Sequence, residues 1–429
     1  MNPRTLNPLA AAGLLLLSAC ARPADSTAPD GTGLLYVWAA DADAKDPDFL
    51  AVLDARAGSP TYGSILNTVT VAGRGNLPHH TEYELTPGAG LWANGWSTGT
   101  TFMFDLSNPL APRPTGAFAA RGGYTYPHSY ARLPNGNVLA TFQSSGEGYT
   151  ASGGLVELDA RGEVVRSASA ISPDVAKGDN WTYSLLVLPD LDRVVVTNTR
   201  MGMVAEYESM MKAAMDSSHH HVSLDVRTTH IQIFRLSDLA LLHTLKLPPQ
   251  GGDHEAYTAE PRRLANGDIY VNTFTCGLYR VVGAETKRPS VTPALFSPVS
   301  EKGSCAVPVV LGNFWIQPST DERMVVAYDL SDAAAPREAS RLVFDSTMSS
   351  PHWLGLDPAR PRLVVTFGDH SVVALVDIDS TTGKLTLDER FRDAGAATPG
   401  VRTDRAKWPH GATGLAKAHG AVFGVPSRR

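Results

Sequence analysis

The sequence predicts an all-β fold, a seven-bladed β-propeller closed by pairing its N-terminal strands with a C-terminal hairpin. The composition favours short strands joined by turns, because 38 glycines and 30 prolines accompany 43% hydrophobic residues. A hairpin-forming unit also recurs along the chain, and seven copies can be counted. The repeat starts and stops within a unit, which is typical of a ring whose two ends share one blade and leave no free sheet edge. Rings of six or eight blades remain compatible with the same pattern.

The repeated unit is clearest at Pro127–Phe142, where two apolar runs flank a Pro-Asn-Gly turn and a histidine follows the first proline. The same arrangement recurs at Pro78–Trp92, Ser350–Phe367 and Pro409–Phe423. In a propeller the first strand of each blade lines the central channel. The four Pro-His pairs are therefore predicted to converge at one mouth of that channel.

The other strands are predicted from runs rich in β-branched and aromatic residues between Gly, Pro, Asp and Asn clusters. In chain order the runs and hairpins are Leu34–Ala39, Phe49–Arg56, Ile65–Val71, Pro78–Trp92, Thr101–Leu106, Gly116–Ala119, Pro127–Phe142, Gly154–Asp159, Glu163–Ser167, Asp179–Asn198, His230–Leu236, Leu241–Leu247, His254–Phe274, Gly277–Val282, Cys305–Gln317, Arg323–Leu330, Ala339–Phe344, Ser350–Phe367, Ser371–Asp379, Leu385–Phe391 and Trp408–Gly424. They make one propeller domain over residues 33–424.

The N-terminus is predicted to be a targeting segment. Residues 1–19 hold a basic residue, Arg4, and an apolar stretch, Leu9–Leu17, that is too short to span a bilayer. The following Leu-Ser-Ala-Cys resembles a bacterial lipobox, which implies cleavage before Cys20 and lipidation of its thiol. Residues 20–32 then form a flexible tether. We expect an exported protein on the periplasmic or cell-surface side that meets the membrane through its lipid only; ordinary secretion is the alternative.

One insertion, residues 201–229, breaks the repeat. It contains five methionines followed by His219–His221. A packed amphipathic helix with a polar loop accounts for this composition. Capture of a soft metal is the other interpretation, because thioether and imidazole groups suit copper.

The Pro-His histidines share a register within their hairpins. His80, His128, His352 and His410 each precede the second strand by ten or eleven residues. In the other hairpins the same register points to Tyr183, to Tyr257 or Thr258, and to a position near Cys305. We expect His254 and Glu255 just above the channel on an entry loop. The remaining histidines are assigned to the surface or to outer strands, namely His219–His221, His243, His370 and His419.

Several imidazoles at one mouth favour a metal site. As cations they repel one another and resist burial, whereas as neutral ligands they can share one ion. An all-imidazole set suits copper, with zinc or another divalent metal as the alternative. The predicted ligands are His79, His80, His128, His254, His352 and His410. Histidines that only form hydrogen bonds beside a wet channel are the competing interpretation.

Other features narrow the function. The net charge of −6 and the lack of a basic tract in the sequence argue against a nucleic-acid partner. Cys276 and Cys305 form either a disulfide or two free buried thiols. Glu82, Glu84 and Glu255 are candidate proton-transfer groups that the sequence does not separate from solvated carboxylates.

The His79-His80 pair, then PHSYARLPNGNVLATF and GGLVELD, resembles the selenium-binding protein / methanethiol oxidase family. HIQIFRLSDLALLHTLKLP matches a further family segment and carries over His230. HEAYTAEPRRLANGDIYVNTF stands where the family has a glutamate-containing pore strand, which carries over Glu255 as a catalytic residue. The family's Cys-Ser-Ser-Cys motif is absent, since Thr81–Trp92 holds no cysteine, and this argues against selenium binding through thiols.

The resemblance implies a seven-bladed propeller with copper on channel histidines, which oxidises methanethiol with O₂ to formaldehyde, H₂S and H₂O₂. Our leading hypothesis is a copper-dependent oxidase of a small sulfur compound. The alternative is a non-catalytic propeller lipoprotein that binds a metal or another ligand. A lactonase-like hydrolase is disfavoured, because the predicted strand heads carry histidine and aromatic residues rather than carboxylates.

Overall fold

The structure is a computed structural model, which describes Met1 and residues 31–146, 149, 151–175, 180–199, 229–249, 257–296, 305–368 and 372–426. Several predicted features lie outside the described residues. These are the signal peptide, Cys20 and nearly all of the tether, residues 201–228 of the insertion, His254, Glu255 and His370. Among the described residues, no helix has the length and apolar character needed to cross a membrane.

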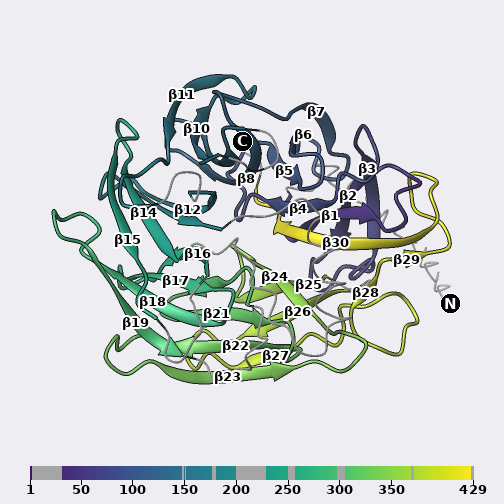
Figure 1. Ribbon diagram of the computed structural model, residues 1–429. Coiled ribbons are helices and arrows are strands. Elements are labelled where there is room, and N and C mark those ends of the chain that lie inside the picture. The colour runs from purple at the N-terminus through teal and green to yellow at the C-terminus, as the bar shows by residue number, and fades with distance from the viewer. Residues whose placement is uncertain are drawn as a thin grey trace, which may run out of the picture.

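Seven antiparallel sheets stand around a common axis (Figure 1). We number these blades by their innermost strands and give each from the axis outward. Blade 1 contains β4 (Pro78–Thr81), β5 (Leu91–Gly95), β6 (Thr100–Asp105) and β7 (Arg113–Phe118). Blade 2 contains β8 (Thr125–Arg132), β9 (Val138–Ser144), β10 (Gly154–Leu158) and β11 (Val164–Ser169). Blade 3 contains β12 (Thr182–Leu188), β13 (Arg193–Asn198), β14 (His230–Arg235) and β15 (Leu241–Lys246). Blade 4 contains β16 (Thr258–Arg263), β17 (Ile269–Thr273), β18 (Gly277–Val282) and β19 (Ser290–Phe296).

Blade 5 contains β20 (Val309–Leu311), β21 (Phe314–Ser319), β22 (Met324–Asp329) and β23 (Arg337–Val343). Blade 6 contains β24 (Pro351–Leu356), β25 (Arg362–Phe367), β26 (Val372–Ile378) and β27 (Leu385–Leu387), with β28 (Val401–Arg402) also paired to β26. Blade 7 contains β30 (Gly414–Phe423), β1 (Leu34–Asp41), β2 (Phe49–Asp54) and β3 (Ile65–Thr70), with β29 (Asp404–Arg405) paired to β30.

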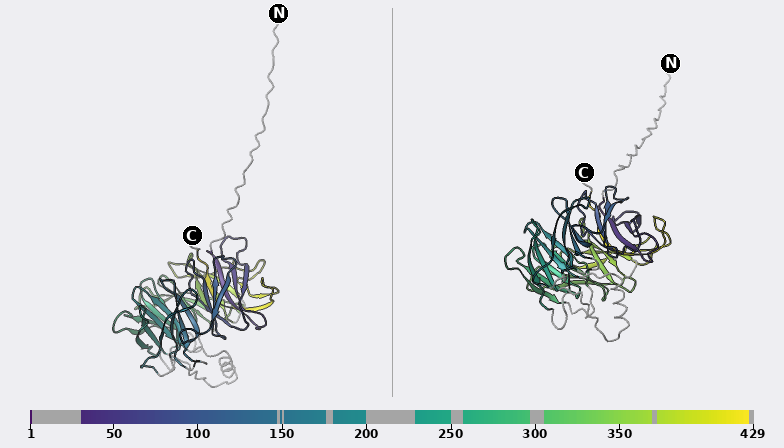
Figure 2. Two further views of the ribbon diagram at one scale, coloured as in Figure 1. Left: turned by 90° about the horizontal axis from the view of Figure 1, so that it is seen from above. Right: turned by 45° about the horizontal axis from the view of Figure 1, so that its top comes forward.

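Blade 7 closes the ring, because β30 pairs with β1 in a register that sets Leu35 opposite Phe423 and Val37 opposite Ala421. Figure 2 shows the yellow C-terminal strand beside the purple N-terminal strands. The predicted seven-bladed, end-to-end closed fold is therefore confirmed. The C-terminal partner differs in one respect: it is a single ten-residue strand rather than the two-stranded hairpin Trp408–Gly424. The N-terminal region already supplies three strands, so a four-stranded blade leaves one place for the C-terminus.

The core lies between adjacent blades rather than at the axis. Trp38 of blade 7 packs against Phe102 and Phe104 of blade 1, with ring centroids 5.5 and 5.8 Å apart. Strand β25 is buried along its full length, because both of its faces are covered by neighbouring blades. Each such large apolar side chain contributes about 1.5–3 kcal/mol on burial. This packing holds the innermost strands rigidly around the channel.

The innermost strands carry bulges where they pass the axis. In β4 and β8 two residues on the inner strand face one on the second strand, between Pro78 and Thr81 and between Pro127 and Tyr130. Register shifts occur at the same level in β12, β16 and β24. A bulge re-aims side chains locally. This allows residues that would alternate on a regular strand to face the channel together.

Candidate metal centre

A repeated polar bridge fixes the inner strands at the bulges. In blade 2 the Thr141 hydroxyl accepts the Ser129 amide (3.0 Å) and donates to the Tyr183 carbonyl of blade 3 (2.8 Å). Thr197, Asn272 and Thr366 hold the same place on the second strands of blades 3, 4 and 6, and each donates to a backbone carbonyl of the next blade. These hydrogen bonds join neighbouring blades at one level and so help to keep the ring in register.

The bridge identifies equivalent channel positions. The carbonyls that accept from a preceding blade belong to His128, Tyr183, Ala259, Ala306 and His419. His79 and His352 hold the matching place after Pro78 and Pro351. These seven residues form one layer, which we call the channel ring. Four of its members are histidines from blades 1, 2, 6 and 7, so the imidazoles gather on one side of the axis.

His79, His80 and His128 form a buried cluster. The His79 and His80 rings stack with centroids 4.4 Å apart and planes at 18°, an arrangement made possible by the bulge in β4. His128 lies 4.3 Å from His80 and 5.1 Å from His79, centroid to centroid. One ligand nitrogen from each of the three residues lies within 4.8 Å of the others. This spacing matches a set of donors that could close on one ion.

His352 and His419 extend the cluster through His79. The His419 ring lies 4.3 Å from His79 and 4.6 Å from His352, and the three residues again offer nitrogens within 4.8 Å of one another. These two residues are only partly buried, whereas His79, His80 and His128 are almost fully buried. The cluster of five therefore has a closed side and an open side.

The predicted location of His419, on the surface or an outer strand, is wrong. His419 lies on β30, the innermost strand of blade 7, because that strand runs through the predicted turn. His410 is displaced for the same reason. It precedes β30, its ring centroid lies 4.7 Å from that of Phe49, and it forms a hydrogen bond with the Thr68 hydroxyl (2.8 Å), so it does not join the cluster.

The other described histidines lie away from the channel ring. His230 opens β14, a third strand, and its Nε2 is 2.7 Å from the Asn180 side-chain oxygen. His243 lies on the outer strand β15, as the sequence predicted. His254 and Glu255 remain predictions, since they lie outside the described residues.

Hydrogen bonds orient the buried imidazoles toward the cluster. His128 Nδ1 is 2.9 Å from the Tyr183 carbonyl, which can only accept, so Nδ1 carries the proton and Nε2 presents its lone pair. His128 Nε2, His80 Nε2, His79 Nδ1 and His419 Nδ1 are buried atoms without a hydrogen-bond partner among the described residues. Buried nitrogens of this kind are costly unless a ligand satisfies them. The donor set therefore fits a metal ion.

Burial keeps these rings neutral. Desolvation, and then the neighbouring imidazoles, lower the pKa of His79 and His80 well below the ordinary value. Desolvation also lowers the pKa of His128 to about 3, against the opposing effect of its hydrogen bond to Tyr183. Neutral imidazole is the form that binds metals. The cluster is thus ready for an ion at neutral pH without losing protons.

A polar network that the sequence analysis missed lies beside His80. The Tyr83 hydroxyl donates to Glu260 (2.8 Å), which also accepts from Ser184 (2.5 Å) and from Arg262 (3.0 Å). Glu260 is fully buried. It sits one residue after the channel ring on β16, whereas the sequence register pointed to Tyr257 or Thr258 there. The earlier candidates differ: Glu82 is buried in an ion pair with Arg132 (2.7 Å), and Glu84 is exposed.

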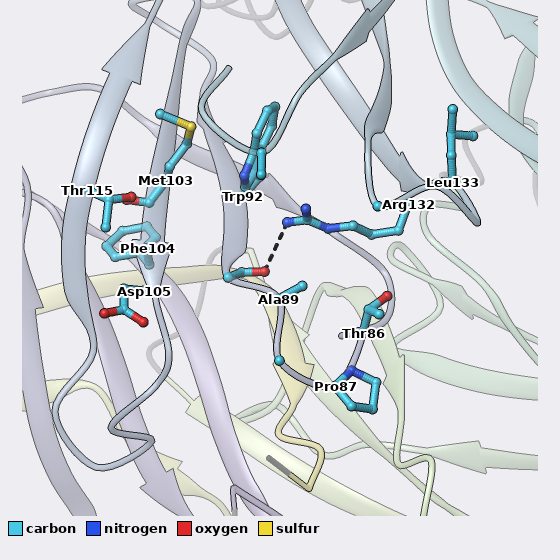
Figure 3. Close-up of a pocket in the computed structure, with 14 residues that line it drawn as sticks. Thr86, Pro87, Ala89, Trp92, Met103, Phe104, Asp105, Thr115, Arg132 and Leu133 are labelled. Carbon is cyan, nitrogen blue, oxygen red and sulfur yellow. Dashed lines mark hydrogen bonds between the residues drawn. The ribbon is translucent and has the colours of Figure 1, made fainter. Parts of the chain in front are cut away.

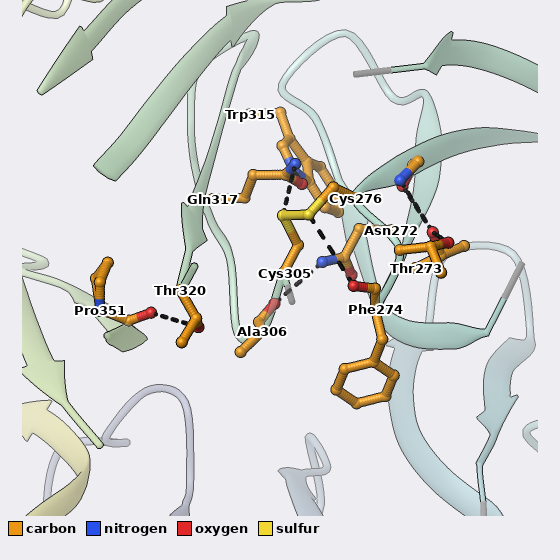
Figure 4. Close-up of a disulfide and its surroundings, with 12 residues drawn as sticks. Asn272, Thr273, Phe274, Cys276, Cys305, Ala306, Trp315, Gln317, Thr320 and Pro351 are labelled. Atoms are coloured by element: carbon orange, nitrogen blue, oxygen red, sulfur yellow. Dashed lines mark hydrogen bonds between the residues drawn. A yellow bond between two sulfur atoms is a disulfide. The ribbon is translucent and has the colours of Figure 1, made fainter. Parts of the chain in front are cut away.

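Cys276 and Cys305 form a disulfide (Figure 4). Of the two possibilities that the sequence left open, a disulfide or two free thiols, the structure has the disulfide. The bond ties the turn after β17 to the residue before Ala306, next to the bridge between Asn272 and the Ala306 carbonyl. Blade 5 is thereby fixed at the level of the channel ring.

A surface cavity of about 440 Å³ lies between blades 1 and 2 (Figure 3). Its lining includes Trp92, Met103 and Arg132, and Arg132 donates to the Gly90 carbonyl (3.1 Å). Its described lining residues include none of the clustered histidines. The cavity is therefore separate from the candidate metal centre.

Two curated proteins share sequence similarity with the chain. It is 31% identical over 170 residues to a methanethiol oxidase of Ruegeria pomeroyi and 30% identical over 160 residues to a methanethiol oxidase of Hyphomicrobium. The predicted resemblance to the selenium-binding protein / methanethiol oxidase family is confirmed. The matches cover 36 and 37% of this chain, and the chain spans only 38 and 35% of the length of those relatives. No family model matches the chain.

Solved structures agree with this family at the level of the fold. A hypothetical selenium-binding protein from Sulfolobus tokodaii superposes with a TM-score of 0.69 at 15% identity, over 92% of this chain and 94% of that one. A putative 6-phosphogluconolactonase from Bacteroides fragilis gives 0.60 at 11% identity, over 93 and 99%. A periplasmic gluconolactonase from Pseudomonas aeruginosa gives 0.57 at 11% identity, over 82 and 94%. The propeller fold is shared with all three.

Proposed function

We propose that this protein is a copper-dependent oxidase of a small sulfur compound, with the metal held by channel histidines. One observation carries the proposal: five imidazoles from four blades converge, and four of their buried nitrogens have no hydrogen-bond partner among the described residues. The similarity to proteins named methanethiol oxidase supports the reaction class. Methanethiol, or a thiol of similar size, is the proposed substrate.

The donor set fits copper. His79, His80 and His128 would hold the ion on the buried side, and His352 with His419 would complete the set through His79. All-nitrogen imidazole sites suit copper and zinc, and only copper is redox-active. Bound copper would supply one-electron and O₂ chemistry together with affinity for a thiolate.

The protein itself would provide a path for the substrate, exclude water from the buried side and orient the His128 ring. The partly exposed His352 and His419 mark the side from which a small substrate would enter. The buried His79, His80 and His128 close the opposite side, so water is excluded there. The Tyr183 carbonyl holds His128 in one tautomer, which avoids reorganisation when a ligand binds.

Export and lipid anchoring form the second part of the proposal, and they rest on the sequence. The lipobox-like Leu17-Ser18-Ala19-Cys20 supports lipidation at Cys20. The disulfide between Cys276 and Cys305 supports a location in an oxidising compartment. Mass spectrometry of protein from membranes should detect a lipid-modified N-terminal Cys20. An unmodified residue 20 would remove this part and leave the oxidase proposal intact.

The oxidase proposal is tested by elemental analysis together with turnover. We expect about one or two coppers per chain, thiol-dependent O₂ uptake, and release of H₂O₂ and H₂S. Metal-free protein should be inactive and should recover on addition of copper. Activity that persists without metal would overturn the proposal. Tight copper binding without turnover would favour the alternative of a non-catalytic metal-binding lipoprotein.

A further inference from the structure

The network beside the metal cluster contains a directional chain of hydrogen bonds. Glu260 is an acceptor paired with Arg262, and the Tyr83 hydroxyl lies 2.8 and 3.0 Å from its two oxygens. A phenol has one proton, so Tyr83 donates it to Glu260 and can only accept from other groups.

The hydroxyl of Ser129 extends this chain of hydrogen bonds, with its donor-to-acceptor order, toward His80. Ser129 Oγ lies 3.1 Å from the Tyr83 hydroxyl and 3.3 Å from His80 Nδ1. Because Tyr83 must accept, Ser129 donates to it and is left with a lone pair toward His80. The Tyr83 oxygen itself is 3.4 Å from His80 Nδ1 and also accepts there. Both neighbours of His80 Nδ1 are therefore acceptors.

We infer that Glu260 is a positioning residue that fixes the tautomer of His80 through Tyr83 and Ser129. Nδ1 carries the proton, and Nε2, which is buried and unpartnered among the described residues, presents its lone pair to the cluster. Carboxylates that orient metal-binding histidines usually contact the ring directly. Here two hydroxyls relay the same effect across three blades.

The surroundings hold this carboxylate in place. Ser184 donates a 2.5 Å hydrogen bond to it, and the Arg262 guanidinium lies 4.1 Å above the Tyr83 ring centroid. The Tyr83 ring also stacks on Trp353, with centroids 5.4 Å apart and planes at 10°. These two ring contacts hold Tyr83 with its hydroxyl at Glu260. Glu260, Arg262 and Tyr83 act as one unit.

The test reads the tautomer directly in metal-free protein. Full-length chain labelled with ¹⁵N-histidine is compared with its Glu260→Gln and Tyr83→Phe variants by long-range ¹H–¹⁵N correlation at pH 7.5. We expect His80 to be protonated at Nδ1 in the parent. Glu260→Gln should give a mixture of tautomers, since an amide can both donate and accept, and Tyr83→Phe should do the same. If either variant fails to fold, the other decides.

Glu157→Gln is the matched control. Glu157 is a buried glutamate paired with Arg166 (2.6 Å), with Asn137 and Asn135 as its further partners. It should leave the His80 tautomer unchanged. An unaltered Nδ1 proton in folded Glu260→Gln and Tyr83→Phe would overturn the inference.

The consequence for metal binding rests on the proposed function and is measured separately. Copper affinity of Glu260→Gln should fall roughly 10–100-fold, the usual cost of removing a group that orients a ligand, while Glu157→Gln keeps the parent value. A parent protein that binds no copper but shows the tautomer shift would refute the metal site and support the role of Glu260. A parent protein that binds copper, with an unchanged His80 tautomer in the variants, would support the metal site and refute the role of Glu260.

Discussion

Single histidines differ sharply in what surrounds them. His128 is buried, held by the Tyr183 carbonyl and aimed at His80, whereas His410 bonds to Thr68 outside the cluster. Both residues follow a proline, so the Pro-His motif alone predicts both as metal ligands. The distinction lies in the strand on which each residue sits.

His128→Ala should lower copper affinity by more than the roughly 10–100-fold typical of losing a residue that only orients a ligand. It removes one of three buried donors while leaving the interblade core untouched. His410→Ala is the control and should keep the parent affinity. Competition titration with a copper chelator measures both. Equal affinities in the two variants would remove His128 from the ligand set.

The buried imidazoles also predict a pH dependence for metal-free protein. The pKa values of His79, His80 and His128 are lower in the folded than in the unfolded chain. The unfolded chain therefore binds more protons than the folded chain below about pH 6.5. Above that pH the free energy of unfolding has its full value, and it decreases as the pH falls toward the pKa of the folded state. Each such histidine adds about 1.4 kcal/mol per pH unit to the slope.

Urea unfolding between pH 7.5 and 5 checks this slope. His128→Gln removes one titrating ring and should unfold with a shallower pH dependence than the parent. A parent protein with flat stability over this range would contradict the assigned neutral state.

At the scale of elements, the bridge between blades explains why the inner strands keep their register. Thr141→Val has almost the same shape but loses both hydrogen bonds, which leaves the buried Ser129 amide without the Thr141 acceptor and the Tyr183 carbonyl with His128 as its remaining side-chain donor. We expect a loss of about 1–3 kcal/mol. Thr386→Val, on the exposed face of β27, should change stability by no more than about 0.5 kcal/mol. Chemical denaturation compares the two, and equal effects would show that the bridge contributes nothing.

The elements also show how far the sequence could lead. The Pro-His hairpins of blades 1, 2 and 6 were predictable, because proline, histidine and the turn recur at one spacing. His419 was not found from that spacing, yet a signal existed. Three N-terminal strand runs leave one place in a four-stranded blade, so the C-terminal segment had to be one strand, with His419 rather than His410 at its channel level.

The role of Glu260 could not be predicted from the sequence, for a different reason. Its role depends on a one-residue bulge in β16, which shifts the channel position from the expected Tyr257 or Thr258 to Ala259. Bulges leave little trace in the sequence. The contacts of Glu260 with Tyr83 and Ser184 also join three separate blades, and no local pattern predicts them.

For the whole molecule, the metal cluster depends on ring closure, because His79 and His419 come from opposite ends of the sequence. They meet at the joint between blades 7 and 1, next to Gly420. A Cβ at Gly420 would lie 2.7 Å from the His79 carbonyl oxygen and 2.8 Å from the Thr81 amide nitrogen, both rigid backbone atoms. The absence of a side chain there lets β30 approach β4 closely enough for the rings to meet.

Gly420→Ala should therefore push β30 away from β4, cost about 1–3 kcal/mol of stability through overpacking, and weaken copper binding without removing any ligand. Gly116→Ala on the outer strand β7 is the control, since its added methyl meets only the flexible end of Met103. Thermal unfolding and copper titration separate the two effects. A Gly420→Ala protein with the parent's stability and affinity would show that the closing joint tolerates expansion. The five histidines would then have to be held by their own blades rather than by the closure of the ring.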